Sequence, residues 1–472
     1  MGSSPRTSEL AISLSGPRGS AASLCGKPLA FRPSLSISFS PRRLEGATFQ
    51  TARRKWVNIQ APRKGAAFPH SGAAEPVVST PPFKRNLDKL RSSHLSRRGV
   101  GQIAPGILRQ AFALIMIVSC GLAAPKPRPP AQPASARSAA ATALAKARDR
   151  VLNASPLAMF YYSDDSVGLA SLQAHVEAMT LLAPQCYRLD REGTLHGQLP
   201  AGVLDVTRRA GLPVMPLVTN PGFDRLEVHV LMHNPKAQER AAKSLAQLAE
   251  RDQFVGWQLD FEGLDPADKL AYTRFVGRVA ARLHHDHRLL SVAVVPRFSD
   301  IYPDTIAPGF HTGEWGAAFD YRGLGRAADF LVLMAYDQHT PSTPPGPVAG
   351  YDWVKAALDY AVRCVPPAKL VLGIPLYGRE WTETLHATTA HSLAHKDLKL
   401  LLADPASDRH WDELARTSWF QLREGETLRT AWFDDARSLR EKLNLAQLYH
   451  LRGYAAWRLG MEDPEFWQLE GK

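Results

Sequence analysis

A regular alternation of short apolar segments and amphipathic helices begins at Leu157 and continues to the C-terminal part of the chain. The segments are rich in β-branched and aromatic residues, which favour strands. Eight can be distinguished: Leu157–Tyr162, Cys186–Leu189, Pro213–Val218, Val255–Phe261, Leu290–Val295, Phe330–Met334, Leu370–Ile374 and Gly453–Trp457. Eight strands alternating with helices predict a (β/α)8 TIM barrel. A doubly wound open sheet is the alternative, because a count of strands cannot show closure.

Capping signals mark the helices between these segments. Asn234-Pro235 predicts the start of a helix that runs to about Glu250, with proline at the first helical position. Asp265-Pro266 predicts the next start, and Asp434 or Asp435 caps a helix that ends before Gly453. Residues 382–430 exceed what a simple connection needs, so we expect a small insertion between strands seven and eight.

The formal charge of +12 comes from the N-terminal part of the chain. Residues 1–100 carry 17 basic and 4 acidic side chains, and the other 372 residues carry 40 basic and 41 acidic ones. Residues 101–472, which include the barrel domain that we place at 151–472, are therefore nearly neutral in total, and a nucleic-acid partner loses its electrostatic support. Residues 1–105 are a low-complexity basic tail, predicted to be disordered or to precede the true start of translation.

Residues 106–124 resemble a signal peptide. The run Ala111–Ala124 is uncharged and apolar, and at 14 residues it has the length of a signal-peptide core rather than of a membrane span. Ile117-Val118-Ser119-Cys120 resembles the lipobox of bacterial lipoproteins, which predicts lipidation of Cys120 and an exported protein of the cell envelope or exterior. A buried apolar helix is the alternative. Residues 125–150, rich in Pro and then Ala, predict a linker.

Two acidic residues end the fourth predicted strand. Side chains alternate along a strand, so Gln258, Asp260 and Glu262 share one face, and Trp257, Leu259 and Phe261 share the other. In a barrel, the first face points inward and its last member reaches the C-terminal mouth, where barrel active sites lie. Two crowded carboxyl groups cannot both ionise cheaply, so one pKa rises and a general acid becomes available. Glycosidic cleavage needs such an acid.

Four motifs together resemble the chitinase-type glycoside hydrolases of family 18. They are the segment from Val255 to Glu262, Leu333-Met334-Ala335-Tyr336-Asp337, Leu372 to Arg379, and Trp457-Arg458-Leu459-Gly460. They follow the family order at the ends of strands four, six, seven and eight. The resemblance covers about residues 157–467 and implies a (β/α)8 barrel, in agreement with the strand count.

The resemblance implies a substrate-assisted retaining mechanism without metal or cofactor. Glu262 would be the general acid and base, Asp260 would hold the substrate's acetamido N–H, and Tyr336 would donate its hydroxyl to the acetamido oxygen. Trp457 would form the apolar floor under the sugar, and Asp337 and Arg379 would bind sugar hydroxyls. The remaining candidate substrate-binding residues are Gln258, Met334 and, as an added subsite, Trp381.

The chain departs from the family motif Asp-x-x-Asp-x-Asp-x-Glu at two positions, which hold Val255 and Gln258. Gln258 can hydrogen-bond Asp260 but cannot share a titrating proton with it. The sequence therefore leaves open the pKa of Asp260, the rate and the natural glycan.

The histidines at 284, 285 and 287 do not converge on one helical face, so a solvated helix end is favoured there over a metal site. The leading hypothesis is a monomeric, exported hydrolase acting on an N-acetylated oligosaccharide or polysaccharide. A carbohydrate-binding protein and an envelope assembly factor on the same barrel are the alternatives.

Overall fold

The computed structural model describes residues 134–301, 313–404 and 407–469. The basic tail of residues 1–105, the signal-like segment with Cys120, and the first part of the expected linker lie outside these residues. The rest of that linker is not a linker: Ala134–Asn153 forms helix α2, whose end packs Ala147 and Val151 against the barrel core. Alanine's high helix propensity accounts for the difference. None of the described helices has the length and apolarity needed to cross a bilayer.

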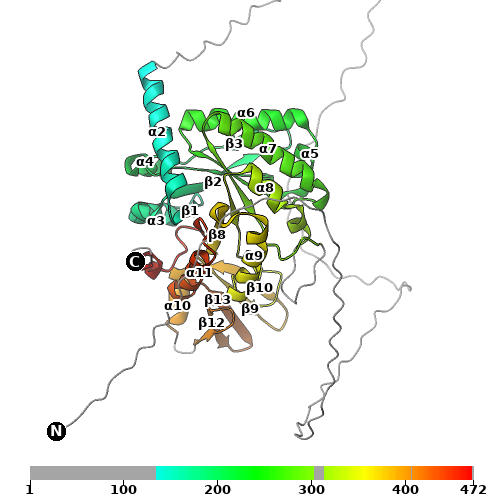
Figure 1. Ribbon diagram of the computed structural model, residues 1–472. Helices are drawn as coiled ribbons and strands as arrows, with labels where there is room; N and C mark the ends of the chain where they lie inside the picture. Colours follow the sequence, from blue (N-terminus) through cyan, green and yellow to red (C-terminus); the bar gives the residue numbers. More distant parts are fainter. Residues whose placement is uncertain (1–133, 302–312, 405–406, 470–472) are drawn as a thin grey trace, which may run out of the picture. The chain divides into compact units, whose positions relative to one another are not determined.

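Eight parallel strands close into a barrel, as predicted (Figure 1). They are β1 (Leu157–Tyr162), β2 (Leu181–Leu189), β4 (Leu217–Thr219), β5 (Gly256–Asp260), β6 (Leu289–Val294), β7 (Phe330–Leu333), β8 (Leu370–Pro375) and β14 (Gly453–Trp457). Pairing of β1 with both β2 and β14 closes the ring and excludes the open sheet. The short β3 (Leu195–Gly197) pairs antiparallel with β2 outside the ring.

Helices surround the ring. They are α3 (Ser166–His175), α4 (Ala201–Ala210), α5 (Arg225–Met232), α6 (Pro235–Asp252), α7 (Lys269–His285), α8 (Tyr321–Ala327), α9 (Tyr351–Cys364) and α11 (Ala436–Leu448), with short 3₁₀ turns at η1 (Val176–Ala178), η2 (Pro221–Phe223), η3 (Pro266–Asp268), η4 (Glu314–Ala318), η5 (Pro367–Lys369) and η6 (Pro464–Gln468). The predicted caps are confirmed. The Asn234 side chain accepts the Ala237 N–H at the start of α6, and Asp435 accepts the Ser438 N–H at the start of α11.

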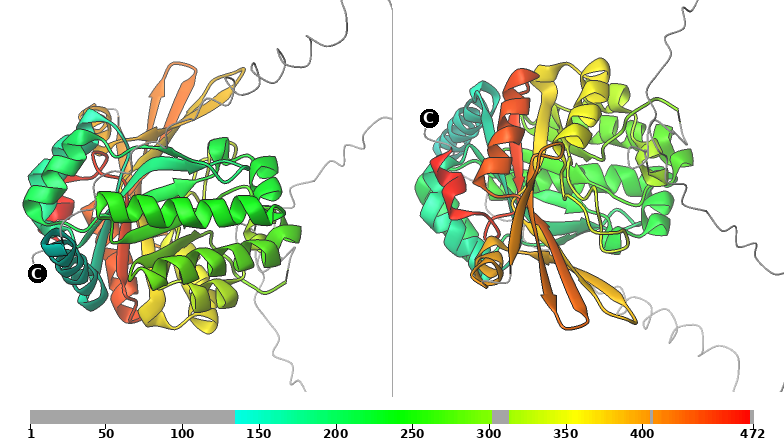
Figure 2. Two further views of the ribbon diagram at one scale, coloured as in Figure 1. Left: turned by 90° about the horizontal axis from the view of Figure 1, so that it is seen from above. Right: turned by 90° about the horizontal axis from the view of Figure 1, so that it is seen from below.

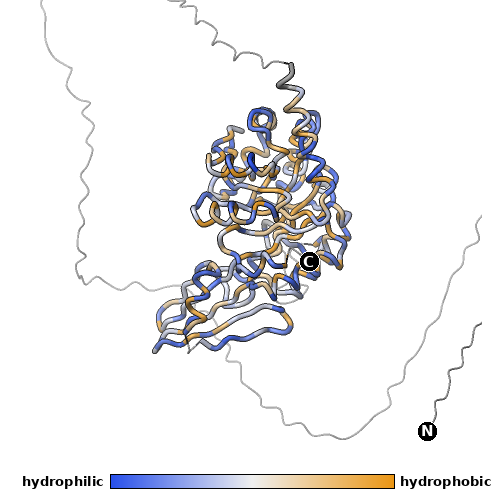
Figure 3. The backbone as a smooth tube through the Cα atoms, turned by 90° about the vertical axis from the view of Figure 1, so that its left-hand side faces the viewer, coloured by the Kyte–Doolittle hydropathy of each residue, from blue (hydrophilic) through white to orange (hydrophobic). Residues whose placement is uncertain are grey.

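Alternation along the strands produces two apolar regions. One side of each strand packs against the helices: the Trp257 indole donates to the carbonyl of Leu245 on α6, with 2.9 Å between Nε1 and O. The other side fills the barrel with residues such as Met159, Phe330, Val332 and Ala455. Figure 3 shows hydrophobic chain segments gathered in the interior and hydrophilic ones at the periphery. The barrel is therefore a packed core below an open mouth.

The insertion between the seventh and eighth barrel strands is an antiparallel sheet with one helix. It consists of β9 (Gly378–Glu383), β10 (Thr388–Leu393), α10 (His395–Leu402), β11 (Asp408–Asp412), β12 (Thr417–Glu424) and β13 (Thr427–Phe433), in the sheet order β10-β9-β13-β12-β11. Its own small core includes Leu398, Phe420 and Phe433. The sheet projects beyond the ring of helices (Figure 2), and it begins directly after β8, at the mouth.

Candidate active site

Strand β5 delivers two carboxyl groups to the mouth of the barrel. Trp257, Leu259 and Phe261 face the helices as predicted, and Phe261 stacks on Tyr272 and Phe275 of α7. The alternate residues, Gln258 and Asp260, are buried on the inner side. Glu262 follows the strand and is half-buried. The spacing that sequence alone indicated therefore places an acid at the rim and a second acid directly below it.

Asn220 holds the backbone of Glu262 in place. The Glu262 N–H donates to Asn220 Oδ1, and Asn220 Nδ2 donates to the Glu262 carbonyl, each at 3.0 Å. Asn220 is 1% exposed and directly follows β4, the neighbour of β5 in the ring. Our sequence reasoning missed this residue. Its position, a polar amide immediately after the third barrel strand, was the available signal.

Burial raises the pKa of both carboxyl groups. The pKa of Glu262 rises to about 8, first because of burial and then because of the negative charges of Asp260 and Asp337. Burial also raises the pKa of Asp260. Asp260 Oδ1 has no hydrogen-bond partner in the described part of the chain, and no ion pair with Lys, Arg or His reaches either carboxylate there. The pair can therefore hold a proton near neutral pH, as the sequence predicted.

Gln258 does not make the hydrogen bond to Asp260 that we considered possible from the sequence. Its Nε2 donates instead to Ser291 Oγ on β6 at 3.0 Å. The register explains the choice, because Gln258 and Ser291 are paired positions of adjacent parallel strands. Gln258 is 0% exposed, so it lies beneath the mouth, and a direct contact with substrate is not supported.

Tyr336 lies beside the two acids at the end of β7. Burial raises the pKa of its phenol well above the ordinary value, and nearby Tyr161, Asp260 and Glu262 add to the rise. The hydroxyl therefore keeps its proton and can donate a hydrogen bond. Gly373 of β8 permits this placement: a Cβ there would lie 3.0 Å from Cε1 of Tyr336 and 2.5 Å from the Leu333 carbonyl oxygen.

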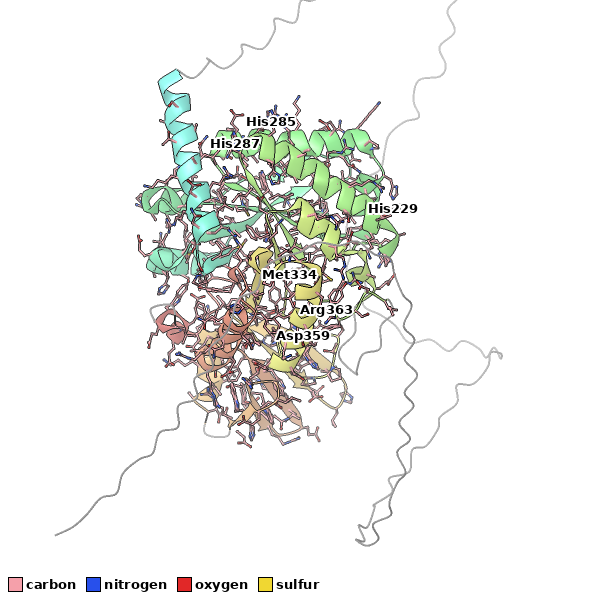
Figure 4. All side chains as sticks on the ribbon, viewed as in Figure 1. His229, His285, His287, Met334, Asp359 and Arg363 are labelled. Atoms are coloured by element: carbon pink, nitrogen blue, oxygen red, sulfur yellow. The ribbon has the colours of Figure 1, made fainter. Side chains whose placement is uncertain are left out.

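Trp457 ends β14 on the opposite part of the rim. Its ring is half-buried and lies 5.1 Å from that of Tyr161, at an angle of 55°. The barrel thus brings Asp260, Glu262, Tyr336 and Trp457 to one mouth from three strands. Met334, labelled near the centre of Figure 4, is only 9% exposed and packs with the core; it offers little surface to a ligand.

Asp337 and Arg379 form a pair rather than two separate sugar contacts. Arg379 Nη2 donates to Asp337 Oδ1 at 2.9 Å, and the Tyr377 hydroxyl donates to the same oxygen at 2.6 Å. Arg379 also donates to the His339 carbonyl and is 5% exposed, whereas the Asp337 side chain is 47% exposed. Asp337 is therefore available to a ligand, and Arg379 is a buried group that orients it, which corrects the expectation for Arg379.

The expectation for Trp381 was wrong. Its ring is 0% exposed, and its Nε1 donates to the Thr343 carbonyl at 3.0 Å, so no face is left for a sugar. Two partly exposed indoles of the insertion lie on the next two strands of the sheet, β13 and β12. Trp432 of β13 is the register partner of Arg379, and Trp419 of β12 is the partner of Trp432. The two indoles stack at 5.5 Å, and His410 of β11 stacks on Trp419 at 4.3 Å.

One group of described residues has the composition of a metal site, and sequence reasoning missed it. Ligand atoms of His229, His233 and Asp268 all lie within 4.8 Å of one another. The four-residue spacing of the two histidines on one helix was the available signal. The cluster considered from sequence is different, because His284 bonds Asp329 and His285 bonds Asp286.

Comparisons with known proteins agree with this geometry. The model of the glycosyl hydrolases family 18 matches residues 209–462. The uncharacterized glycosylase YvbX of Bacillus subtilis is 25% identical over 314 residues, covering 65% of this chain and 88% of that protein. The cortical fragment-lytic enzyme of B. subtilis is 28% identical over 297 residues, covering 62% and 67%.

Solved structures show the same likeness. A chitinase from Chromobacterium violaceum superposes with a TM-score of 0.61 at 28% identity, over 66% of this chain and 97% of that one. The spore cortex-lytic enzyme SleL of Bacillus megaterium superposes with a TM-score of 0.60 at 26% identity, over 66% and 72%.

Proposed function

This chain belongs to the glycosyl hydrolases of family 18 and is a glycosidase, and we propose that it cleaves β-linked N-acetylglucosamine glycans by a substrate-assisted retaining mechanism. One observation carries the proposal: Glu262 lies at the barrel mouth beside Asp260, and its pKa is raised to about 8 without a cationic partner in the described residues. A protonated carboxylic acid is what the departing glycosidic oxygen requires.

In the first step, Glu262 gives its proton to the glycosidic oxygen as the bond from that oxygen to C1 breaks. The carbonyl oxygen of the substrate's own 2-acetamido group bonds to C1 and forms an oxazolinium ion. Asp260 accepts the acetamido N–H and balances the positive charge, while the protonated Tyr336 hydroxyl donates to the acetamido oxygen. Trp457 packs against the sugar's C–H face.

In the second step, the Glu262 carboxylate removes a proton from water as the water oxygen bonds to C1. The oxazolinium ring opens, the acetamido group is restored, and Glu262 is again protonated. Two inversions at C1 give net retention. Asn220 positions Glu262 through the two backbone hydrogen bonds described above.

We further propose that Trp432 and Trp419 provide the added subsite first sought at Trp381. Their side chains share one face of the insertion sheet with Arg379, which donates a hydrogen bond to Asp337 at the mouth. Stacked indoles next to a sugar site offer flat apolar surfaces of the kind that sugar C–H faces cover.

The test uses matched N-acetylated and deacetylated substrates. Chitooligosaccharides and peptidoglycan fragments carry the acetamido nucleophile, whereas glucosamine oligomers of the same length do not. We expect hydrolysis of at least one acetylated substrate with a β-configured first product, observed by NMR, and no hydrolysis of the deacetylated oligomers. Equal hydrolysis of both would contradict substrate assistance. Binding without turnover would instead support a carbohydrate-binding protein. This is the second candidate function, because Gln258 stands where the family motif has an acid.

Export and lipid anchoring through Cys120 remain a proposal that rests on the sequence alone. We expect the natural product to lack peptides from residues 1–95 and to carry lipid at Cys120. Mass spectrometry of the native protein would show either the lipidated terminus or, against the proposal, peptides from the basic tail.

A further inference from the structure

A group of two histidines and one aspartate lies outside the sugar site, between the connections that follow the third and fourth barrel strands. His229 lies on α5, and His233 is the residue that ends it, one helical turn later; the His233 N–H donates to the His229 carbonyl at 3.2 Å. Their rings lie 4.6 Å apart at 43°. Asp268 closes η3, immediately before α7. The fold therefore brings the two imidazoles to a carboxylate from a different connection.

The distances within this group suit a shared ion. His233 Nε2 lies 2.8 Å from Asp268 Oδ1, and His229 Nδ1 lies 2.9 Å from Oδ2. Two ligand atoms bound at about 2.1 Å to one tetrahedral zinc ion are about 3.4 Å apart, so each pair needs to separate by only about 0.5 Å to admit the ion. A small rotation of the rings would direct all three ligand atoms at one point, since they already lie within 4.8 Å of one another.

The burial pattern distinguishes this group from an ordinary surface ion pair. The Asp268 side chain is 1% exposed, whereas those of His229 and His233 are 48% and 56% exposed. Asp268 holds the N-cap position of α7, yet its side chain accepts no backbone N–H of that helix. Both carboxylate oxygens are turned instead toward the imidazoles. A buried carboxylate below two partly exposed imidazoles leaves the outer side open to water or a further ligand.

We propose that His229, His233 and Asp268 bind one divalent first-row transition cation of the zinc type. Imidazole nitrogens and a carboxylate oxygen are ligands that such ions prefer. Magnesium and calcium, which select oxygen ligands, are not expected to compete. The bound ion cross-links α5 to the start of α7, and these elements follow the segments that contain Asn220 and Glu262. Its role is structural, because it joins two helices of the outer ring.

The experiment measures binding directly, in the full chain without a histidine tag. The protein is stripped with a chelator, the chelator is removed, and ZnCl₂ is titrated by calorimetry. We expect one zinc ion per chain. His233→Ala removes one of three ligands, and we expect affinity to fall by about 100-fold or more, since even outer-shell changes cost about 10- to 100-fold. His229→Gln should act similarly.

The matched control removes histidines from the other end of α7. His285 and His287 lie away from His229 (Figure 4), and the double variant His285→Ala/His287→Ala should bind zinc like the parent. Absence of zinc binding would overturn the proposal and leave two hydrogen-bonded His–Asp contacts. The proposal would also be overturned if His233→Ala left the zinc affinity unchanged, or if the control variant lowered that affinity as much. Either result would mean that the zinc binding is adventitious.

A second readout covers the case in which a variant is poorly folded. Cobalt(II) added to the parent should give visible absorption bands from imidazole ligation, and zinc should raise the parent's melting temperature but not that of His233→Ala. A parent that shows neither effect does not have the site. None of these measurements uses glycosidase activity, so a negative result leaves the proposed hydrolysis untouched.

Discussion

Two pairs of acidic residues in the described part of the chain, Asp434 with Asp435 and Asp260 with Glu262, differ in their partners. At the base of the insertion, Asp434 accepts hydrogen bonds from Lys442 Nζ at 2.5 Å and from Ser438 Oγ at 2.9 Å. Its neighbour Asp435 accepts from Ser418 Oγ at 2.7 Å and from Arg409 Nη2 at 3.0 Å. At the mouth, Asp260 and Glu262 have no such cation among the described residues. Burial raises the pKa of Asp434 as well, but the charge and hydrogen bond of Lys442 oppose the rise.

This contrast separates acids that serve stability from acids that serve chemistry. An acid with a buried cation is neutralised, and its removal or that of its partner costs stability. An acid buried without one keeps a raised pKa, which costs stability but provides a proton donor. Adjacent or near-adjacent acidic residues in a sequence look alike in both cases. The partner, which comes from a distant part of the chain, decides between the two roles.

The largest effect is expected from Glu262→Gln. Glutamine keeps the shape but cannot donate a proton to the leaving group, so we expect kcat to fall by about 10³-fold or more. The stability of the variant, in contrast, should increase at alkaline pH. Because the folded pKa is raised, Glu262 favours the folded state below pH 4.5 and loses that contribution as the pH rises toward about 8. The variant should therefore unfold at higher urea than the parent at pH 8, with no such gain at pH 4.

The control for this variant is Glu239→Gln, whose side chain is 69% exposed. It should change neither kcat nor the urea midpoint. A Glu262→Gln protein that hydrolyses substrate at the parental rate would exclude the proposed acid, whatever its stability.

Lys442→Met should lower stability and leave catalysis nearly unchanged, the reverse of the result expected for Glu262→Gln. Methionine has a similar length but no charge, and it leaves Asp434 buried without a cation. Breaking a buried ion pair in this way costs about 3–5 kcal/mol, measured as the free energy of unfolding in urea. We expect kcat per folded molecule to stay near the parental value. The double variant Lys442→Met/Asp434→Asn should recover much of the loss. Unchanged stability in the single variant would mean that the two buried pairs do not differ as described.

The fold was largely predictable from the sequence because its signals are local. The eight apolar segments, the Asn234-Pro235 and Asp435 helix starts and the long connection after the seventh strand were each visible in short windows. Closure was not visible, because it depends on the pairing of β1 with β14 across almost 300 residues. Residues 134–150 were wrongly predicted to belong to a linker, because the segment before them is Pro-rich and the Ala-rich helix was not recognised.

The candidate site was predictable where strand alternation decides it. Asp260 and Glu262 follow from the alternation along one strand, whereas Tyr336 and Trp457 came from the motifs of the family resemblance. Trp381 and Arg379 were not predictable in this way, because burial in β9 depends on what the insertion sheet packs against. Asn220 and the group of His229, His233 and Asp268 were missed because each joins two connections, and only the folded chain shows that those connections meet.

A smaller effect is expected at the insertion. Trp432→Ala removes one ring of the stacked row, and aromatic contacts of this kind contribute about 0.5–1.5 kcal/mol. We therefore expect KM for long oligosaccharides to rise by roughly 3- to 10-fold, with little change for disaccharides or in kcat. Trp411→Ala is the control, because Trp411 pairs with Ser418 rather than Trp419 and its ring lies over Arg437. Equal effects of the two variants would remove the subsite from the insertion.

The smallest effect concerns Gln258, the position where the mouth departs from its family. Activity of the parent needs protonated Glu262, so kcat should fall as pH rises through the pKa near 8. Gln258→Asp adds a carboxylate below Asp260, and its negative charge disfavours ionisation of both acids above it. The alkaline limb of the pH profile should therefore move to higher pH, by about one unit. Gln258→Asn, which adds no charge, is the control and should leave the limb in place. A limb that moves to lower pH in the aspartate variant would show that position 258 does not act on the two acids through its charge.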